Sequence, residues 1–374
     1  MYPWPAVKRL SAVARRPLLL ALLLSLLLAA GATAPTEAHR RAVFPIESLG
    51  SRGINVTALQ HLLRAKGSSL TISGVFDGAT QQQVAALQEL AGLKRDGVVN
   101  AATWERLLPV LAPGARTEAV TALQRLLNKK RRSGLTVNGY YDSATRETVT
   151  AFQAHMGLNA SGRVNLATWR NLLWHYVKPA FASTALCDYH SGNGKASNWA
   201  TSAAVAQVEA AAALFHGRTG LKTSHGEASL EHGGNIAGHS THELGLDVDV
   251  GLIRRDGRHC RRLGLDYRHA QYDRARTRRL IEAIYDAAPG RVKLIYFNDP
   301  VLVREGLVVS YPNHSHHLHI RYCEVGHAQP RYRCPAPALD AGLELPLIAA
   351  STSGELAPGP SGMSLAARLA RHRY

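Results

Sequence analysis

The sequence predicts a multidomain protein. Two small all-α three-helix domains come first, and an α+β domain follows whose central antiparallel sheet holds a metal ion. Three observations predict this fold class. Residues 51–174 contain one unit written twice. Segments 246–250 and 317–320 alternate polar and apolar residues, which is typical of half-buried strands. Histidines are concentrated beside both of these segments, as expected at a metal site.

The N-terminal segment predicts export. Basic residues precede the apolar run 18–30, and the small residues 31–34 follow it. This order is typical of a secretory signal peptide, so residues 1–34 are interpreted as one, with cleavage after Ala32 or Ala34. The apolar run is shorter than the ~20 residues of a spanning helix, which disfavours an uncleaved anchor. We therefore expect the mature protein in the periplasm or the extracellular cell wall.

Composition narrows the class of partner. The chain has 374 residues, 46% of them hydrophobic and 19% charged, as is ordinary for globular domains. Lys and Arg number 44 against 27 Asp and Glu, a net charge of +17. Such an excess favours nucleic acid, an anionic membrane surface or an acidic wall polymer. Export excludes nucleic acid and leaves the other two. The oligomeric state is not specified by these features.

The four cysteines predict two disulfides. An even number in an exported chain is typical of a disulfide framework, and four cysteines allow three connectivities. We favour Cys323–Cys334 because it closes a short loop, which leaves Cys187–Cys260. Zinc ligation by these cysteines is the alternative, but no C-x-x-C pair supports it.

The repeated unit predicts two three-helix domains, at 51–110 and 111–176, after a linker at 35–50. Its period of about 65 residues is larger than a solenoid unit. The matching pairs are Leu59 with Leu123, Gln60 with Gln124, Asp77 with Asp142, Gln88 with Gln153 and Trp104 with Trp169. The two aspartates are predicted to cap the second helix of each copy. The two tryptophans are interpreted as core anchors in the third helices.

These repeats resemble the three-helix peptidoglycan-binding domain that is attached to cell-wall hydrolases. Both copies carry A-L-Q-x-L-L, [FY]-D-x-x-T, an L-Q or F-Q pair, G-L and T-W-x-x-L-L. The resemblance implies binding to peptidoglycan, and a doubled module raises effective affinity through avidity. The alternative is a structural helical spacer.

The second half of the chain predicts two polar strand faces. In 246–250 the residues alternate, so Asp247 and Asp249 share one face and the two valines enter the core. We expect this strand to begin near Leu244, with His242 folding back over the same face. A glycine-rich loop precedes it, because glycine is costly inside a helix.

The segment 317–320 follows the same pattern, with His317 and His319 on one face. If the two strands are neighbours, His242, Asp249 and His319 converge. Two imidazoles, one carboxylate and water form a four-coordinate catalytic zinc site with an open position. Carboxylates on a buried strand are acceptable when they coordinate a metal.

Both segments resemble the LAS-type zinc peptidases, which include lysostaphin-like enzymes, D-Ala-D-Ala peptidases and the hedgehog fold. The penicillin-insensitive murein endopeptidases are the closer match: residues 238–249 fit G-H-x-x-H-x-x-G-L-D-V-D, and residues 314–321 fit H-x-x-H-x-H-[VI]-R. The segment 295–300 is similar to an Asn-Pro-containing strand end of that family. An extra His316 and an inserted Asp299 depart from the pattern.

The resemblance implies one Zn²⁺ with His242, Asp249 and His319 as ligands. It implies His317 as the general base, with His239 and His314 lining the site to hold substrate or the developing oxyanion. Asp247 is interpreted either as the carboxylate that orients a ligand histidine or as a solvated residue at the strand end. Three further histidines are interpreted as loop residues that lie nearby: His225, His232 and His316.

The resemblance implies an exported zinc metallo-endopeptidase, at 187–338, that hydrolyses D-alanyl–diaminopimelate cross-links of peptidoglycan. A D,D-carboxypeptidase that trims stem peptides shares the metal and the base and is the nearest alternative. A catalytically silent peptidoglycan-binding protein is a second. A structural wall anchor is a third, although it leaves the histidines unexplained. Residues 339–374 are interpreted as a flexible tail.

Overall fold

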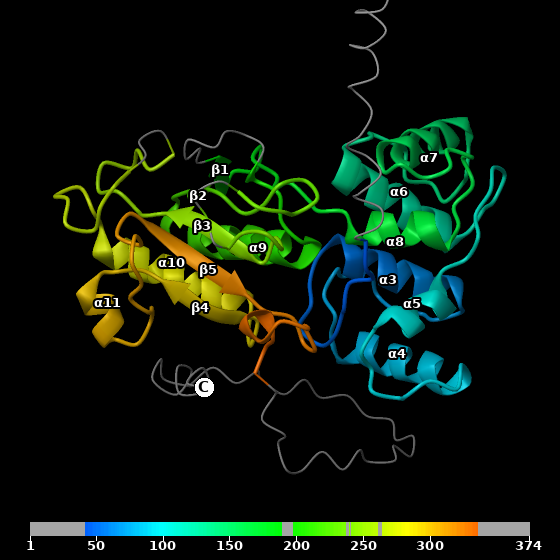
Figure 1. Ribbon diagram of the computed structural model, residues 1–374, viewed down its shortest axis with the longest axis horizontal. Coiled ribbons are helices and arrows are strands. Elements are labelled where there is room, and N and C mark those ends of the chain that lie inside the picture. The colour runs from blue at the N-terminus through cyan, green and yellow to red at the C-terminus, as the bar shows by residue number, and fades with distance from the viewer. Residues whose placement is uncertain (1–41, 189–196, 237–238, 240, 261–263, 336–374) are drawn as a thin grey trace, which may run out of the picture.

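The computed structural model describes residues 42–188, 197–236, 239, 241–260 and 264–335 (Figure 1). The predicted signal peptide and the predicted tail lie outside the described residues. A helical half is followed by a half built on a five-stranded sheet. Within the described ranges, no helix combines the length and apolarity needed to cross a membrane.

Each repeat forms three helices. They are α3 (Ile54–Ala65), α4 (Gly78–Leu90) and α5 (Ala101–Leu107), then α6 (Glu118–Arg131), α7 (Ser143–His155) and α8 (Leu166–Trp174). The predicted caps are confirmed: Asp77 and Asp142 accept hydrogen bonds of 2.8 Å from the backbone N–H groups of Thr80 and Thr145. Asn100 and Asn165 cap α5 and α8 in the same way.

Trp104 and Trp169 are core anchors, as predicted. Both are fully buried, and each indole Nε1–H donates a 2.8 Å hydrogen bond to a proline carbonyl, of Pro45 and Pro109 respectively. A buried indole needs such a partner for its polar end. Pro45 belongs to the segment before the first repeat, so that segment packs on the repeat through this bond.

The repeated glutamines hold the loops between helices. Gln124 on α6 donates to the carbonyl of Tyr140 at 3.0 Å and to the Thr145 hydroxyl at 3.2 Å, while its Oε1 accepts from the N–H of Gly139 at 3.0 Å. Gln60 makes the equivalent contacts in the first repeat. One buried amide therefore satisfies several backbone groups of a loop that has no secondary structure of its own.

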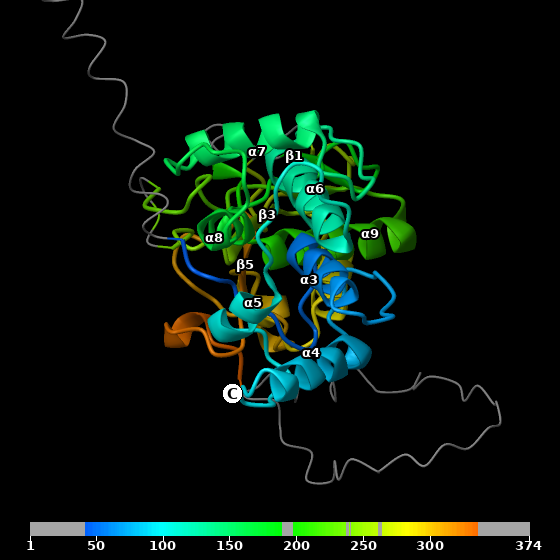
Figure 2. The ribbon, with the colours of Figure 1, turned by 90° about the vertical axis from the view of Figure 1, so that its right-hand side faces the viewer.

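The two repeats share one hydrophobic core. Helices α3 and α6 pack against each other, and buried side chains of both repeats form a single cluster that includes Leu59, Trp104, Leu123 and Trp169. Figure 2 shows α3 lying beside α6, with α9 of the second half next to it. The repeats therefore form one double module.

The second half contains a mixed sheet with strand order β1-β2-β3-β5-β4. The strands are β1 (Leu186–Asp188), β2 (Thr223–His225), β3 (Asp247–Gly251), β4 (Val292–Tyr296) and β5 (His317–Tyr322). The predicted antiparallel sheet needs one correction, because β1 and β2 are parallel. The chain between them passes through α9 (Ser202–Thr219), and such a crossover returns a strand in the same direction.

Helices α9 and α10 (Arg274–Ala287) cover the apolar face of the sheet (Figure 1). Val248, Val250, Leu318 and Ile320 are at most 1% exposed and belong to the core with these helices. The alternation predicted for both strands is thus confirmed. The polar side chains of β3 and β5 must then project from the opposite face. The short elements α11 (Pro300–Arg304) and η2 (Pro330–Tyr332) complete the described structure.

Strand β3 begins later than predicted. It starts at Asp247 rather than near Leu244. His242 and Gly245 have positive φ angles of 71° and 64°, so this part of the chain turns and cannot be extended. The favoured disulfides, Cys187–Cys260 and Cys323–Cys334, are both present.

The helical half docks on the sheet half through α3 and α6. The backbone N–H of Asn55 donates to the Ser202 hydroxyl at 3.2 Å, and Lys129 pairs with Glu209 on α9 at 2.9 Å. Gly53 lies at the contact with φ of 115°, where a Cβ atom would come within 2.6 Å of the Ser202 carbonyl oxygen. Only glycine fits there without a shift of backbone.

Candidate metal centre

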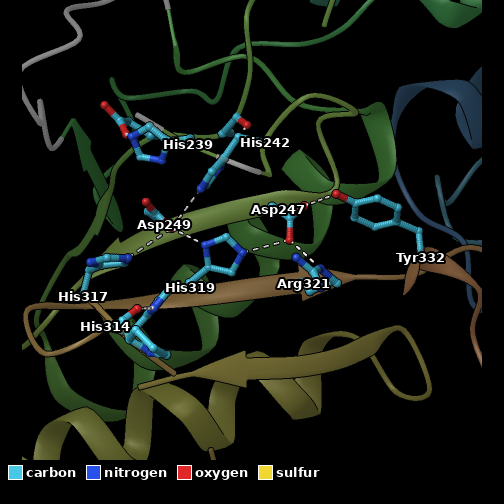
Figure 3. A network of polar contacts seen from close by, with 12 residues as sticks. His239, His242, Asp247, Asp249, His314, His317, His319, Arg321 and Tyr332 are labelled. Atoms are coloured by element: carbon cyan, nitrogen blue, oxygen red, sulfur yellow. Dashed lines mark hydrogen bonds and ion pairs between the residues drawn. The ribbon is translucent and has the colours of Figure 1, made fainter. Parts of the chain in front are cut away.

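Strand pairing brings the predicted ligands together. The register places Asp249 of β3 directly opposite His319 of β5. The prediction that the two polar strands are neighbours is therefore confirmed. His242 reaches over β3 from the preceding turn, so three side chains from separate segments converge (Figure 3).

The distances fit a tetrahedral zinc ion. Asp249 Oδ1 lies 3.0 Å from His319 Nδ1 and 3.4 Å from His242 Nε2. Ligands on a tetrahedral zinc with bonds of about 2.0–2.1 Å lie about 3.3 Å apart. Asp249 Oδ1 is buried and lacks a well-formed hydrogen bond in spite of these neighbours. A buried carboxylate oxygen facing imidazole nitrogens without hydrogen bonds is the arrangement that a metal ion satisfies.

Both histidines expose the correct nitrogen to Asp249. His242 Nδ1 lies 3.0 Å from the Ala228 carbonyl, which only accepts, so Nδ1 carries the proton and Nε2 has the free lone pair. His319 Nε2 donates to Asp247 Oδ1 at 2.9 Å, so Nδ1 is the nitrogen that faces Asp249 and that would bind a metal ion after losing its proton. Such partners fix the tautomer of metal-ligating histidines. The ligand roles themselves stay predictions.

Asp247 is a buried anchor for His319. It is 0% exposed, so the interpretation as a solvated strand-end residue is wrong. Besides His319, it accepts hydrogen bonds from Arg321 Nε at 2.7 Å and the Tyr332 hydroxyl at 2.5 Å. Burial raises the pKa of this carboxyl, but the contacts with His319, Arg321 and Tyr332 outweigh burial and lower it to about 2. Asp247 is therefore charged and holds the His319 ring in place.

The site favours positive charge. Burial lowers the pKa of His319, but the hydrogen bond to Asp247 and the negative charges of Asp247 and Asp249 outweigh it and raise the pKa to about 9. His317, with fewer such contacts, has a pKa that burial lowers to about 4. Two buried carboxylates therefore attract a cation to the position between His242, Asp249 and His319.

The remaining predicted residues line the rim. His317 Nε2 lies 3.6 Å from Asp249 Oδ1. The His314 ring lies 5.0 Å from that of His317, between ring centres. His239 lies 5.1 Å from the His242 ring, and its Nε2 pairs with Glu227 at 2.6 Å. The six predicted site residues form two adjoining groups of potential ligands, His239–His242–Asp249 and His314–His317–His319, which meet where Asp249 faces His319 (Figure 3).

Sequence reasoning missed two residues of this site. Glu227, which is 4% exposed and holds His239, follows β2 without any local pattern. Tyr332 comes from η2 near the Cys323–Cys334 disulfide, beyond both motifs. Arg321 is the last residue of the motif at 314–321, and this position is the sequence feature that could have predicted its contact with Asp247.

One of the three histidines interpreted as loop residues needs correction. His225 belongs to strand β2 between β1 and β3, and it is fully buried. Its isolated position among glycines hid this strand. His232 does lie in a loop, and it joins a second cluster of histidines at the boundary of the two halves. His316 is exposed before β5, as expected.

Comparison with protein families assigns the repeats. Residues 52–107 and 116–172 match the family described as a putative peptidoglycan binding domain. These segments contain α3–α5 and α6–α8. No curated protein matches the chain. The protein therefore carries two helical domains of the peptidoglycan-binding type, which support peptidoglycan as its partner and are consistent with a place at the cell wall.

Proposed function

We propose that the protein is an exported zinc-dependent peptidase that hydrolyses peptide cross-links of peptidoglycan, of the D-alanyl–diaminopimelate type. The observation that carries the proposal is the convergence of His242, Asp249 and His319 on one face of β3 and β5. Two peptidoglycan-binding domains precede this centre in the same chain and bring it to its substrate.

The chemistry that zinc supplies when bound is polarisation of the scissile carbonyl and activation of a water molecule. Held by three protein side chains, the ion would remain accessible to substrate or water. His317 lies beside Asp249 and takes the proton from the attacking water, then returns it to the leaving amine. His239 and His314 lie on opposite sides of the ligand histidines, where they hold the substrate and donate to the developing oxyanion.

The test uses mature protein, residues 35–374, on purified cross-linked muropeptide dimers, with products read by mass spectrometry. We expect conversion of dimers to monomers that a chelator abolishes and zinc restores. His319→Ala should be inactive, whereas the exposed His269→Ala should match the parent. Loss of only a terminal D-alanine would instead identify a D,D-carboxypeptidase. Zinc-loaded protein that binds wall sacculi and cleaves nothing would make the protein a silent binder.

A further inference from the structure

We propose that the protein holds a second zinc ion, in a structural site that joins the second peptidoglycan-binding domain to the sheet half. The proposed ligands are His155, His175, Glu231 and His232. Each offers one ligand atom, and these four atoms lie within 4.8 Å of one another. Four side-chain ligands would leave no open position, and a closed set is what distinguishes structural from catalytic zinc sites.

The ligands come from both halves of the molecule. His155 ends α7 and His175 follows α8, both in the second repeat. Glu231 and His232 lie in the loop between β2 and β3. The nitrogens His155 Nε2 and His175 Nε2 each lie 3.4 Å from Glu231 Oε1. This is close to the ligand separation of about 3.3 Å on a tetrahedral zinc.

The histidine rings are prepared for a metal. His175 is fully buried, and its Nδ1 donates to the Tyr176 carbonyl at 2.8 Å, so Nε2 presents its lone pair to the cluster. Trp174 stacks on His232 with 5.9 Å between ring centres and an interplanar angle of 12°. His232 Nε2 is buried and has no hydrogen-bond partner. Burial lowers the pKa of each imidazole, which is consistent with neutral rings.

A single guanidinium nitrogen faces three of the four groups in the cluster. Arg131 at the end of α6 points into it: Nη1 lies 2.5 Å from Glu231 Oε1, 3.2 Å from His155 Nε2 and 3.3 Å from His175 Nε2. One Nη group carries two hydrogens, so it cannot serve three acceptors at once. His232 adds a fourth group that Arg131 does not reach in any hydrogen bond. A divalent cation satisfies all four lone pairs together.

Arg131 marks the position of the cation. Its side chain is 26% exposed, so the guanidinium can rotate towards solvent when zinc enters. Removing this side chain should therefore strengthen zinc binding at the cluster. If Arg131 were instead the permanent cation of the site, the same change would weaken the boundary and create no zinc affinity.

The test counts zinc by native mass spectrometry on full-length mature protein that has been stripped with chelator, reloaded with zinc and freed of excess metal. We expect two zinc ions per chain in the parent and in the His269→Ala control. His319→Ala should keep one, and so should the double variant His155→Ala/His232→Ala. Circular dichroism checks that each variant is folded. In the His319→Ala background, Arg131→Met should bind its single zinc more tightly.

The outcomes separate this site from the catalytic one. A parent with one zinc that His319→Ala removes would overturn the second site and leave the proposed function intact. A parent with one zinc that survives His319→Ala and disappears in His155→Ala/His232→Ala would support the second site while contradicting the catalytic centre. An Arg131→Met variant that binds no zinc in the His319→Ala background would also overturn the proposal.

Discussion

At the scale of single residues, Asp247 should control metal affinity without touching the metal. Asp247→Asn removes the charge that holds His319 Nε2, and it leaves Arg321 buried without its anion. Loss of a carboxylate behind a ligand histidine typically costs 10–100-fold in metal affinity. We expect a loss of about that size for the catalytic zinc, measured by competition with a chromophoric chelator in His155→Ala/His232→Ala protein. Tyr332→Phe, which removes one neutral donor, should lose less, and an unchanged affinity in Asp247→Asn would contradict this account.

Lys130 should make stability depend on pH. Its ammonium is buried and donates to the carbonyls of Leu173 and His175 at 2.7 and 2.9 Å. Burial lowers its pKa from 10.5 to about 7. Between these values the unfolded chain binds more protons than the folded one, so stability rises with pH from about 7 to 10.5, by up to about 1.4 kcal/mol per pH unit.

Urea unfolding at pH 7 and pH 9.5 tests this slope. As the pH rises, the free energy of unfolding should increase more for the parent than for Lys130→Met. Equal slopes in the two proteins would show that Lys130 stays fully charged in the fold.

The residues that sequence could identify were those set by strand periodicity. Strand alternation places the polar side chains of Asp249 and His319 on one face, and the register then brings them together. His242 was identified from the motif that it shares with Asp249, although it lies in the turn before β3. Glu227 and Tyr332 reach the site from loops with no repeating pattern, so only the folded chain reveals them.

At the scale of elements, the buried Gln124 should contribute to the free energy of unfolding by holding the loop between α6 and α7. Gln124→Ala leaves the Gly139 N–H and the Tyr140 carbonyl without their side-chain partner. Each unsatisfied buried group costs about 1–3 kcal/mol. We expect a loss of that order in the free energy of urea unfolding. The exposed Gln82→Ala on α4 should stay within about 0.5 kcal/mol of the parent, and similar values for both variants would contradict the loop-holding role.

Elements were predictable where local rules decide. The Asp77 and Asp142 caps follow from side-chain chemistry within one helical turn. The start of β3 was misplaced because Gly245 and His242 adopt positive φ, which is a property of the turn and not of hydrophobic alternation. The parallel pairing of β1 with β2 depends on where α9 packs, which no short segment specifies.

At the scale of the whole molecule, docking of the two halves should depend on Gly53. Gly53→Ala places a Cβ atom 2.6 Å from the Ser202 carbonyl oxygen on α9. We expect weaker docking, seen as a larger radius of gyration in small-angle scattering and faster proteolysis between residues 175 and 186. Gly67→Ala is the matched control, because Gly67 also has positive φ but no neighbour within 4 Å of the new atom. Equal changes in radius of gyration and proteolysis rate for both variants would show that strain from the positive φ angle, and not the contact with Ser202, causes the effect.

The shared core and the docking of α3 on α9 also have a consequence for work on an insoluble polymer. A tethered enzyme with a loose linker sweeps a volume and cuts whatever it meets. A catalytic centre that is rigidly joined to its binding module can cleave only bonds at one fixed distance from the site where the module binds. If the peptidase proposal holds, each landing of the double module on the wall exposes a single cross-link to attack. Dissociation from the polymer, rather than bond cleavage, would then limit the rate at which cross-links are hydrolysed.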